Sequence, residues 1–237
     1  MLKLHDINTY YDKSHVLFDI SLTVNQGEIV ALVGRNGVGK TTTIKTIMGL
    51  APIVQGSIQY KEKEMVGQKS HKIALAGIGL VPEERWIFPS LTVQQNLLMG
   101  IKPGQYKKKV GQGWDIDKCY EHFPFLKERC NQKGGFLSGG EMQILSIVRT
   151  LLGNPDLVLI DEPTEGLAPM IVEQVSNIIK EINESGTTIL LVEQQLPIVL
   201  GLAHRIYLMN KGSIKWEGTP EDLQERNDIR KKYLEVS

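Results

Sequence analysis

The feature that most constrains the fold is a glycine-rich loop that directly follows a short apolar run. Residues 34–41 read Gly-Arg-Asn-Gly-Val-Gly-Lys-Thr and fit the pattern GxxxxGK[ST]. The preceding run, Ile29–Val33, has the continuous apolar character of a strand buried on both faces. A strand, such a loop and a following helix form the phosphate-binding unit of an α/β protein. The sequence therefore predicts an α/β fold built around this loop.

Further apolar runs extend the α/β pattern along the chain. Continuous runs, expected to be buried parallel strands, occupy residues 78–81, 157–160, 188–192 and 206–209. Alternating segments, expected to be half-buried antiparallel strands, occupy residues 2–7, 16–24 and 57–60. We therefore expect a mixed core sheet around the phosphate loop and an antiparallel β-layer near the N-terminus.

The middle of the chain has a different pattern. From about residue 91 to 152 the apolar residues are spaced by three and four, as in helices, with a polar interruption at residues 102–118. We interpret this stretch as a helical subdomain inserted between two core strands. Residues 1–237 would then form a single domain, with a core of residues 1–90 and 153–237. Thr219 and Pro220, followed by two acids, predict one more helix start near the C-terminus.

Composition excludes several classes of protein. Lysine plus arginine equals aspartate plus glutamate, 27 each, so no overall field attracts nucleic acid or an anionic membrane. The run Lys107, Lys108 and Lys109 is expected to be a solvated loop face. Cys119 and Cys130 fit neither a disulfide framework nor a zinc site. The N-terminus lacks a signal pattern, and no run approaches the ~20 apolar residues that span a bilayer. We expect a cytosolic chain that reaches a membrane only through a partner.

The residue types of the loop suit phosphate binding. Glycines allow backbone N–H groups to converge on phosphate oxygens, and the following helix presents its positive dipole end there. Lys40 is expected to reach the β- and γ-phosphates, and Thr41 to place its hydroxyl on Mg²⁺. The predicted nucleotide-binding residues of this region are Gly34, Arg35, Asn36, Gly37, Val38, Gly39, Lys40, Thr41 and Thr42.

An acidic pair ends the apolar run at residues 157–160. Asp161 is suited to hold Mg²⁺ through a water, and Glu162 can orient and deprotonate an attacking water. The alternative is an aspartate that caps a helix, followed by a surface glutamate. That alternative fits many strand ends, but not one paired with a phosphate loop upstream.

A second phosphate-binding element lies between the loop and the acidic pair. Leu137-Ser138-Gly139-Gly140-Glu141 reads as a Ser-Gly-Gly turn that opens a helix. One bound nucleotide does not need two such elements within one chain. The surplus needs an explanation.

These motifs, in this order, resemble those of the ATP-binding cassette family over nearly the whole chain. In that family the element that corresponds to residues 137–141 is called the signature. Two cassettes pair head to tail, so the signature of one protomer closes on the γ-phosphate held by the other. The resemblance implies ATP and Mg²⁺ as ligands and a second cassette, sister or self, as a partner. It also implies that ATP is bound in trans by Ser138, Gly139, Gly140 and Glu141.

Other positions follow from the resemblance. Tyr11 falls where family members stack an aromatic ring on adenine, with neighbouring Tyr10 as the alternative. Glu83 falls where the family usually has a glutamine that joins Mg²⁺ to the membrane-subunit contact. Gln194 falls where most members carry a histidine that senses the γ-phosphate. In the segment Glu165-Gly166-Leu167-Ala168, the usual aspartate is absent.

Glutamine can donate a hydrogen bond to a γ-phosphate but cannot carry the positive charge of a protonated histidine. Because the other motif residues are present, we expect a working ATPase with a substituted switch. The predicted catalytic residues are Glu162, Lys40 and Gln194, and the predicted metal-binding residues are Thr41, Asp161 and Glu83.

The substitutions narrow the resemblance further. The segments VPEERWIFPSLTVQQNLLMG, DEPTEGLAP and LLVEQ are similar to those of ATP-binding subunits of branched-chain amino acid importers. This implies ATP hydrolysis coupled to uptake of branched-chain or other small hydrophobic amino acids. It also implies membrane-spanning permease subunits as partners, a substrate-binding protein as an indirect one, and a peripheral place on the cytoplasmic face of the inner membrane. Trp86, Phe88, Pro89 and Leu91 form a candidate docking surface for the permease.

Three alternatives remain. Importers of urea or short-chain amides share these sequence variants, and lipid or lipopolysaccharide exporters can have a chain of this length. The Glu83 and Gln194 pattern argues against an exporter. A soluble cassette protein of translation or DNA repair belongs to another class, and it usually has two fused cassettes or a long coiled coil. This chain has one phosphate loop and no extended heptad run, and no nucleic-acid partner is expected.

Overall fold

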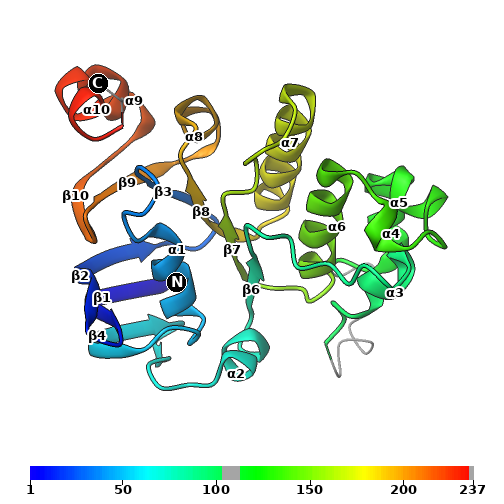
Figure 1. The fold of residues 1–237 in the computed structure, drawn as a ribbon, viewed down its shortest axis with the longest axis horizontal. Helices are drawn as coiled ribbons and strands as arrows, with labels where there is room; N and C mark the ends of the chain where they lie inside the picture. Colours follow the sequence, from blue (N-terminus) through cyan, green and yellow to red (C-terminus); the bar gives the residue numbers. More distant parts are fainter. Residues whose placement is uncertain (103–112, 235–237) are drawn as a thin grey trace.

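The computed structural model describes residues 1–102 and 113–234, so the lysine run at 107–109 lies outside the described residues. A six-stranded core sheet has the order β10-β9-β3-β8-β7-β6 (Figure 1). Its strands are β3 (Ile29–Val33), β6 (Ile78–Val81), β7 (Leu157–Asp161), β8 (Thr188–Glu193), β9 (Arg205–Asn210) and β10 (Ser213–Gly218). All neighbours pair in parallel except β10, which pairs antiparallel with β9. The predicted mixed core sheet is confirmed.

The parallel strands at the centre of this sheet are buried on both faces. Every residue of β3, β7 and β8 is buried. This explains the continuous apolar runs, since helices or the second sheet cover each face of a parallel sheet. Strand β10 was not predicted, because it is an edge strand whose residues are half-buried or exposed and include Lys215 and Glu217.

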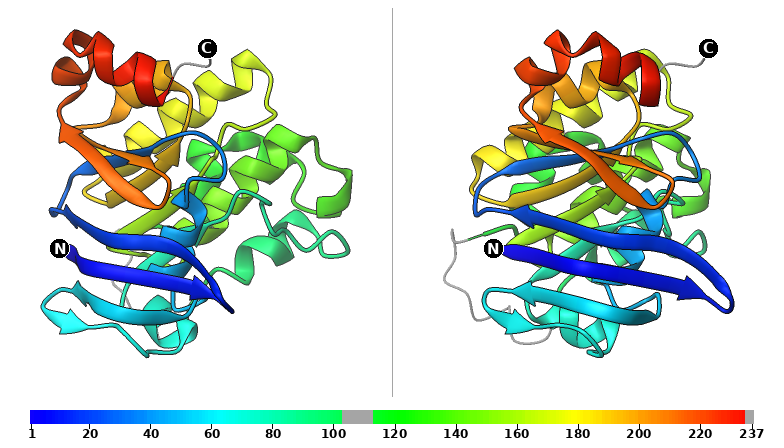
Figure 2. Two further views of the ribbon diagram at one scale, coloured as in Figure 1. Left: turned by 60° about the vertical axis from the view of Figure 1, so that its left-hand side comes forward. Right: turned by 90° about the vertical axis from the view of Figure 1, so that its left-hand side faces the viewer.

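The predicted antiparallel layer is a second sheet with the order β2-β1-β4-β5. Its strands are β1 (Leu2–Tyr11), β2 (Ser14–Val24), β4 (Ile53–Tyr60) and β5 (Lys63–Glu64). Strand β1 extends past the predicted end at residue 7 because register shifts interrupt its alternation. The Phe18 N–H of β2 donates to the Gly212 carbonyl (2.8 Å), so this layer lies against the β9–β10 turn (Figure 2).

The helices lie on the flanks of the core sheet. They are α1 (Lys40–Ile47), α2 (Ser70–Leu75), α3 (Val93–Leu98), α4 (Ile116–His122), α5 (Pro124–Glu128), α6 (Gly139–Leu151), α7 (Pro169–Glu184), α8 (Leu196–Leu202), α9 (Pro220–Glu225) and α10 (Asn227–Tyr233). Helices α3 to α6 lie between β6 and β7 in the chain and form the right-hand side of the molecule in Figure 1. The exact domain boundaries stay a prediction. Among residues 1–102 and 113–234, no helix combines the length and apolar character needed to cross a bilayer.

The parallel arrangement brings several loops to one edge of the core sheet. The carboxyl ends of β3, β6, β7 and β8 lead into the phosphate loop, Glu83, Asp161 with Glu162, and Gln194 respectively. In open α/β sheets, ligands bind outside the carboxyl ends of the strands. The fold therefore gathers the candidate residues from four separate parts of the chain.

Candidate functional site

Glycine is required in the phosphate loop because of both backbone angles and space. Gly37 and Gly39 have φ angles of +75° and +109°, in the left-handed region. A Cβ on Gly39 would come within 2.8 Å of the side chains of Leu17 and Met209. The loop can therefore turn tightly into α1, which begins at Lys40.

The loop borders a cavity of about 250 Å³. Its lining residues are Val16, Asn36, Gly37, Gly39, Lys40, Thr41, Thr42, Glu83 and Glu162. Three predicted loop residues do not line it: Gly34 and Arg35 turn their carbonyls to Lys40, and Val38 packs into the hydrophobic core. The structure thus brings most of the predicted loop residues together with Glu83 and Glu162.

Lys40 is almost completely buried and fully paired. Its Nζ lies 3.0 Å from Glu162 Oε1 and donates to the carbonyls of Gly34 (2.8 Å) and Arg35 (3.0 Å). A buried ammonium group has three N–H donors, and here each has an acceptor. Phosphate oxygens bound in the cavity would replace one or more of these acceptors.

Thr41 and Asp161 lie next to each other beside Lys40. The Thr41 hydroxyl donates to Asp161 Oδ1 over 3.2 Å. Burial raises the pKa of Asp161 to about 6, aided by the nearby charge of Glu83 and opposed by the Thr41 hydrogen bond and Lys40. A hydroxyl and a carboxylate are oxygen ligands of the type that Mg²⁺ prefers, and a cation there would favour the ionised carboxylate. The residues therefore fit a magnesium ion.

The protein alone supplies few ligands for that ion. Among the described residues, no group of three His, Cys, Asp or Glu side chains is placed to hold a metal. Mg²⁺ usually keeps waters and binds through one or two protein groups plus substrate phosphates. The arrangement of Thr41 and Asp161 agrees with that mode.

Glu162 is held in a strained and buried position. Its φ angle is +41°, which is unusual for a residue with a side chain, and its N–H donates to the Val192 carbonyl (2.9 Å). Burial raises the pKa of Glu162 to about 7, with a further rise from Glu165 and opposition from Lys40. A carboxyl with this pKa is suited to take a proton near neutral pH.

Gln194 contacts Glu162 directly. Its Nε2 donates to Glu162 Oε2 (2.8 Å) and also to Glu165 Oε2 (2.7 Å). Gln194 was predicted from the sequence, but this role of Glu165 was not. The segment that begins at Glu165 was noted only because it lacks the aspartate that is usual in the family. The signal that could have suggested a role for Glu165 is the presence of three acids within residues 161–165.

Tyr11 lies at the end of β1, with 40% of its surface exposed, and does not line the cavity. The ring of Tyr10 is already stacked on His15, with centroids 4.0 Å apart. Of the two tyrosines, Tyr11 therefore has the more available ring. Its role in adenine binding stays a prediction.

The signature residues lie away from the cavity and cap α6. Ser138 accepts from the Glu141 N–H (3.3 Å), and Glu141 Oε2 accepts from the Ser138 N–H (2.8 Å), which makes a capping box. Glu141 also pairs with Arg129 (3.1 Å). Gly139 and Gly140 form the first turn of α6, and none of the four lines the cavity. Their contact with nucleotide stays a prediction.

A phosphate loop, a buried lysine, an adjacent threonine and aspartate, and a carboxylate poised as a base lie together at the edge of a parallel sheet. These features define a phosphate-loop nucleotide-binding protein equipped to hydrolyse its nucleotide. Residues 17–165 match the sequence profile of the family described as ABC transporter. The chain belongs to this family and is an ATP-binding cassette ATPase.

Individual relatives cover almost the whole chain. It is 42% identical, over 99% of both chains, to the high-affinity branched-chain amino acid transport ATP-binding protein BraG of Pseudomonas aeruginosa. It is 34% identical to the lipopolysaccharide export system ATP-binding protein LptB of Haemophilus influenzae, over 99% of this chain and 97% of that one. A crystal structure of the ADP conformation of an ABC transporter cassette aligns with a TM-score of 0.83 and 28% identity, over 98% and 97% of the two chains. The predicted family and fold class are confirmed.

Proposed function

We propose that this chain is the ATP-hydrolysing subunit of an importer for branched-chain or other small hydrophobic amino acids. The observation that carries the proposal is the 42% identity to BraG over 99% of both chains. Identity to the lipopolysaccharide export protein is lower, at 34%. Glu83 and Gln194 support an importer as well, although urea and amide importers share these variants. An amide importer is therefore the second candidate.

The site residues have separate roles in this proposal. Mg²⁺, when bound with ATP, would neutralise charge on the phosphates, and Thr41 and Asp161 would hold it. Lys40 would exchange its loop carbonyls for oxygens of the β- and γ-phosphates. Glu162 would take the proton of the water that attacks the γ-phosphate in line. Burial and the raised pKa of Glu162 suit it to that task.

Two further sets of residues would complete the nucleotide site. Tyr11 would stack on adenine, since its ring is exposed and Tyr10 is occupied by His15. Ser138, with the backbone N–H groups that begin α6, would bind the γ-phosphate held by a second cassette. The surplus phosphate-binding element is then half of a site shared by two chains.

The permease would bind a surface beside α3. Trp86 is 51% exposed and Phe88 is 44% exposed. A groove of about 290 Å³ next to Phe88 is lined by residues of α1, α2, β6, α3 and α6 or their ends, including Met48, Ala74, Leu80, Met99 and Arg149. Exposed apolar side chains around a groove are typical of a protein-binding site. Docking there would keep the chain on the cytoplasmic face of the membrane, with a substrate-binding protein on the opposite side.

The test uses the transporter reconstituted in proteoliposomes with its permease, second cassette and binding protein. We expect ATP-dependent uptake of labelled leucine. The variant Glu162→Gln should bind a fluorescent ATP analogue with unchanged affinity but lose hydrolysis and uptake, because an amide cannot accept the proton. Uptake of urea or a short amide in place of leucine would contradict the proposed substrate. Normal hydrolysis by Glu162→Gln would contradict the role of the base.

A further inference from the structure

Glu193, the last residue of β8, has a buried carboxylate that joins two loops. Only 1% of its surface is exposed. Its Oε2 accepts from the Thr164 hydroxyl (2.6 Å), and its Oε1 accepts from the backbone N–H groups of Gln194 (2.8 Å) and Gln195 (3.0 Å). The Gln195 side chain donates in turn to Thr164 Oγ1 (3.0 Å). We call Thr164, Glu193 and Gln195 the Glu193 clamp.

The clamp fixes the two loops that carry the candidate catalytic groups. Thr164 lies between Glu162 and Glu165 in the loop after β7. Gln194 lies between Glu193, the last residue of β8, and Gln195. The contacts of the Gln194 amide with Glu162 and Glu165 therefore depend on the distance that the clamp sets between the loops.

A carboxylate is an expensive means of merely holding two loops together. Burial of a charged group is unfavourable unless donors surround it, and here three donors are committed to one side chain. The strands themselves need no such bond, because β7 and β8 are already paired along their length. What the carboxylate adds is direction, since hydrogen bonds fix the backbone at Gln194 whereas apolar packing tolerates small shifts.

We propose that Glu193 is a positioning residue for ATP hydrolysis. Through Thr164, it holds the loop after β8 against the loop after β7, and so keeps the Gln194 amide against Glu162. This inference rests on the proposed roles of Glu162 and Gln194. No member of the clamp lines the cavity. The clamp therefore acts on kcat and leaves ATP binding unchanged.

The experiment compares Thr164→Val with Thr164→Ser in the assembled transporter. Valine has almost the shape of threonine but no hydroxyl, whereas serine keeps the donor to Glu193. We expect Thr164→Val to lower kcat roughly 10-fold to 100-fold, with KM for ATP and the affinity for a fluorescent ATP analogue unchanged, because small misplacements of catalytic groups have effects of this size. Thr164→Ser should retain at least about half of the wild-type kcat.

A double variant separates positioning from general structure. In the Gln194→Ala background, Thr164→Val should lower kcat by less than about twofold, because the group that the clamp positions is already gone. If Thr164→Val does not fold, Thr164→Ala serves instead, since alanine also lacks the hydroxyl that donates to Glu193.

Three results would overturn the proposal. They are a wild-type kcat in Thr164→Val, equal losses in Thr164→Val and Thr164→Ser, and an undiminished effect in the Gln194→Ala background. A wild-type transporter that hydrolyses no ATP would instead contradict the proposed function.

Discussion

At the scale of single residues, Gln194 makes a pair of hydrogen bonds that a neutral histidine could not reproduce. Both hydrogens of its amide nitrogen are used, one toward Glu162 and one toward Glu165. A neutral imidazole has a single N–H donor and could satisfy only one of these carboxylates. The glutamine therefore joins two acids that would otherwise repel each other. Its oxygen is left to accept a hydrogen bond, which a water molecule can donate.

The variant Gln194→Glu tests this view. A third carboxylate would meet Glu162 and Glu165 without a donor between them. We expect the free energy of unfolding of the nucleotide-free protein at pH 8 to fall by about 1–3 kcal/mol relative to wild type, since like charges at this distance in a partly buried site repel. Urea denaturation measures the change.

The control for this prediction is Gln194→Ala, which removes the same two hydrogen bonds and adds no charge. At pH 5 the free energy of unfolding of Gln194→Glu should lie closer to that of wild type. Burial raises the pKa of Glu162 to about 7, so Glu162 is protonated at pH 5 and no longer repels the new carboxylate. A Gln194→Glu protein as stable as Gln194→Ala at pH 8 would rule out the repulsion.

The sequence predicted the residues of the site better than their contacts. Lys40, Thr41, Asp161 and Glu162 belong to motifs in which spacing along the chain fixes the place of each side chain, and the structure does bring them together. The partnership of Thr164 with Glu193 joins distant loops, and no periodicity encodes the direction of a side chain across neighbouring strands. Such contacts require the register of β7 on β8.

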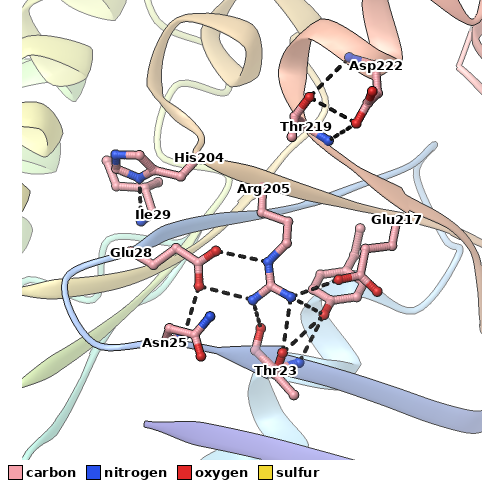
Figure 3. Close-up of polar contacts among 10 residues, drawn as sticks. Thr23, Asn25, Glu28, Ile29, His204, Arg205, Glu217, Thr219 and Asp222 are labelled. Atoms are coloured by element: carbon pink, nitrogen blue, oxygen red, sulfur yellow. Dashed lines mark hydrogen bonds and ion pairs between the residues drawn. The ribbon is translucent and has the colours of Figure 1, made fainter.

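At the scale of elements, Arg205 of β9 joins the two sheets (Figure 3). Its guanidinium donates to both oxygens of Glu28 (2.9 and 3.0 Å), to the Thr23 carbonyl of β2 (2.8 Å) and to Glu217 of β10 (2.7 Å). The neighbouring His204 accepts from the Ile29 N–H (2.9 Å) through Nδ1. His204 is thus hydrogen-bonded to the first residue of β3.

The ion pair between Arg205 and Glu28 predicts how the stability of the fold depends on pH. Burial alone would raise the pKa of Glu28, but hydrogen bonds from Arg205 and Asn25 outweigh it, so the pKa lies below its usual value. A carboxyl with a lowered pKa adds stability above its unfolded pKa, near 4.3, and this stability is lost as pH falls through the folded value. Glu28→Gln should therefore lower the thermal midpoint at pH 7. Its decline from pH 5 to pH 3 should be shallower than in wild type.

Thermal unfolding at pH 7, 5, 4 and 3 measures this difference. Glu225→Gln, on the exposed end of α9, is the matched control and should follow the wild-type curve. Parallel curves for wild type and Glu28→Gln would show that the ion pair makes no net contribution.

Elements were predicted well where one physical signal dominates. Each of the five parallel strands contains a continuous apolar run of buried or half-buried residues, and α9 begins at Pro220 with Thr219 and Asp222 in a capping box (Figure 3). Strand β5, with two exposed residues, has no hydrophobic signal at all. Its position follows only from pairing with β4, which depends on the tertiary fold.

At the scale of the whole molecule, the side chain of Arg85 connects the helical region with the loop that follows β7. Arg85 donates to Gln143 of α6 (3.2 Å) and to the Glu165 carbonyl (3.2 Å). Arg85 and its neighbour Trp86 both have positive φ angles, +65° and +37°, so the backbone is strained where it leaves β6 for the helices. A movement of α6 would therefore displace, through Arg85, the loop that carries Glu162.

In the assembled transporter, each ATP site should consist of the phosphate loop of one chain and the signature of the other. If Ser138 contacts the nucleotide of the second cassette, a negative charge at position 138 should stop hydrolysis at the partner's ATP site and leave hydrolysis at this chain's own site unchanged. Ser138→Asp provides that charge while keeping a good N-cap for α6, and Ser138→Asn keeps the cap without the charge. Both proteins should therefore fold with the stability of wild type, which thermal unfolding checks.

Photolabelling with an azido-ATP analogue, trapped with vanadate, reports which phosphate loop has turned over. In a pair formed with a sister cassette, Ser138→Asp should remove the label from the sister and leave it on this chain, because the aspartate repels the γ-phosphate facing it. Ser138→Asn should label both chains, and Lys40→Ala should lose label only on this chain. Loss of this chain's own label in Ser138→Asp, with the sister still labelled, would place the signature on its own nucleotide and refute a site shared between chains.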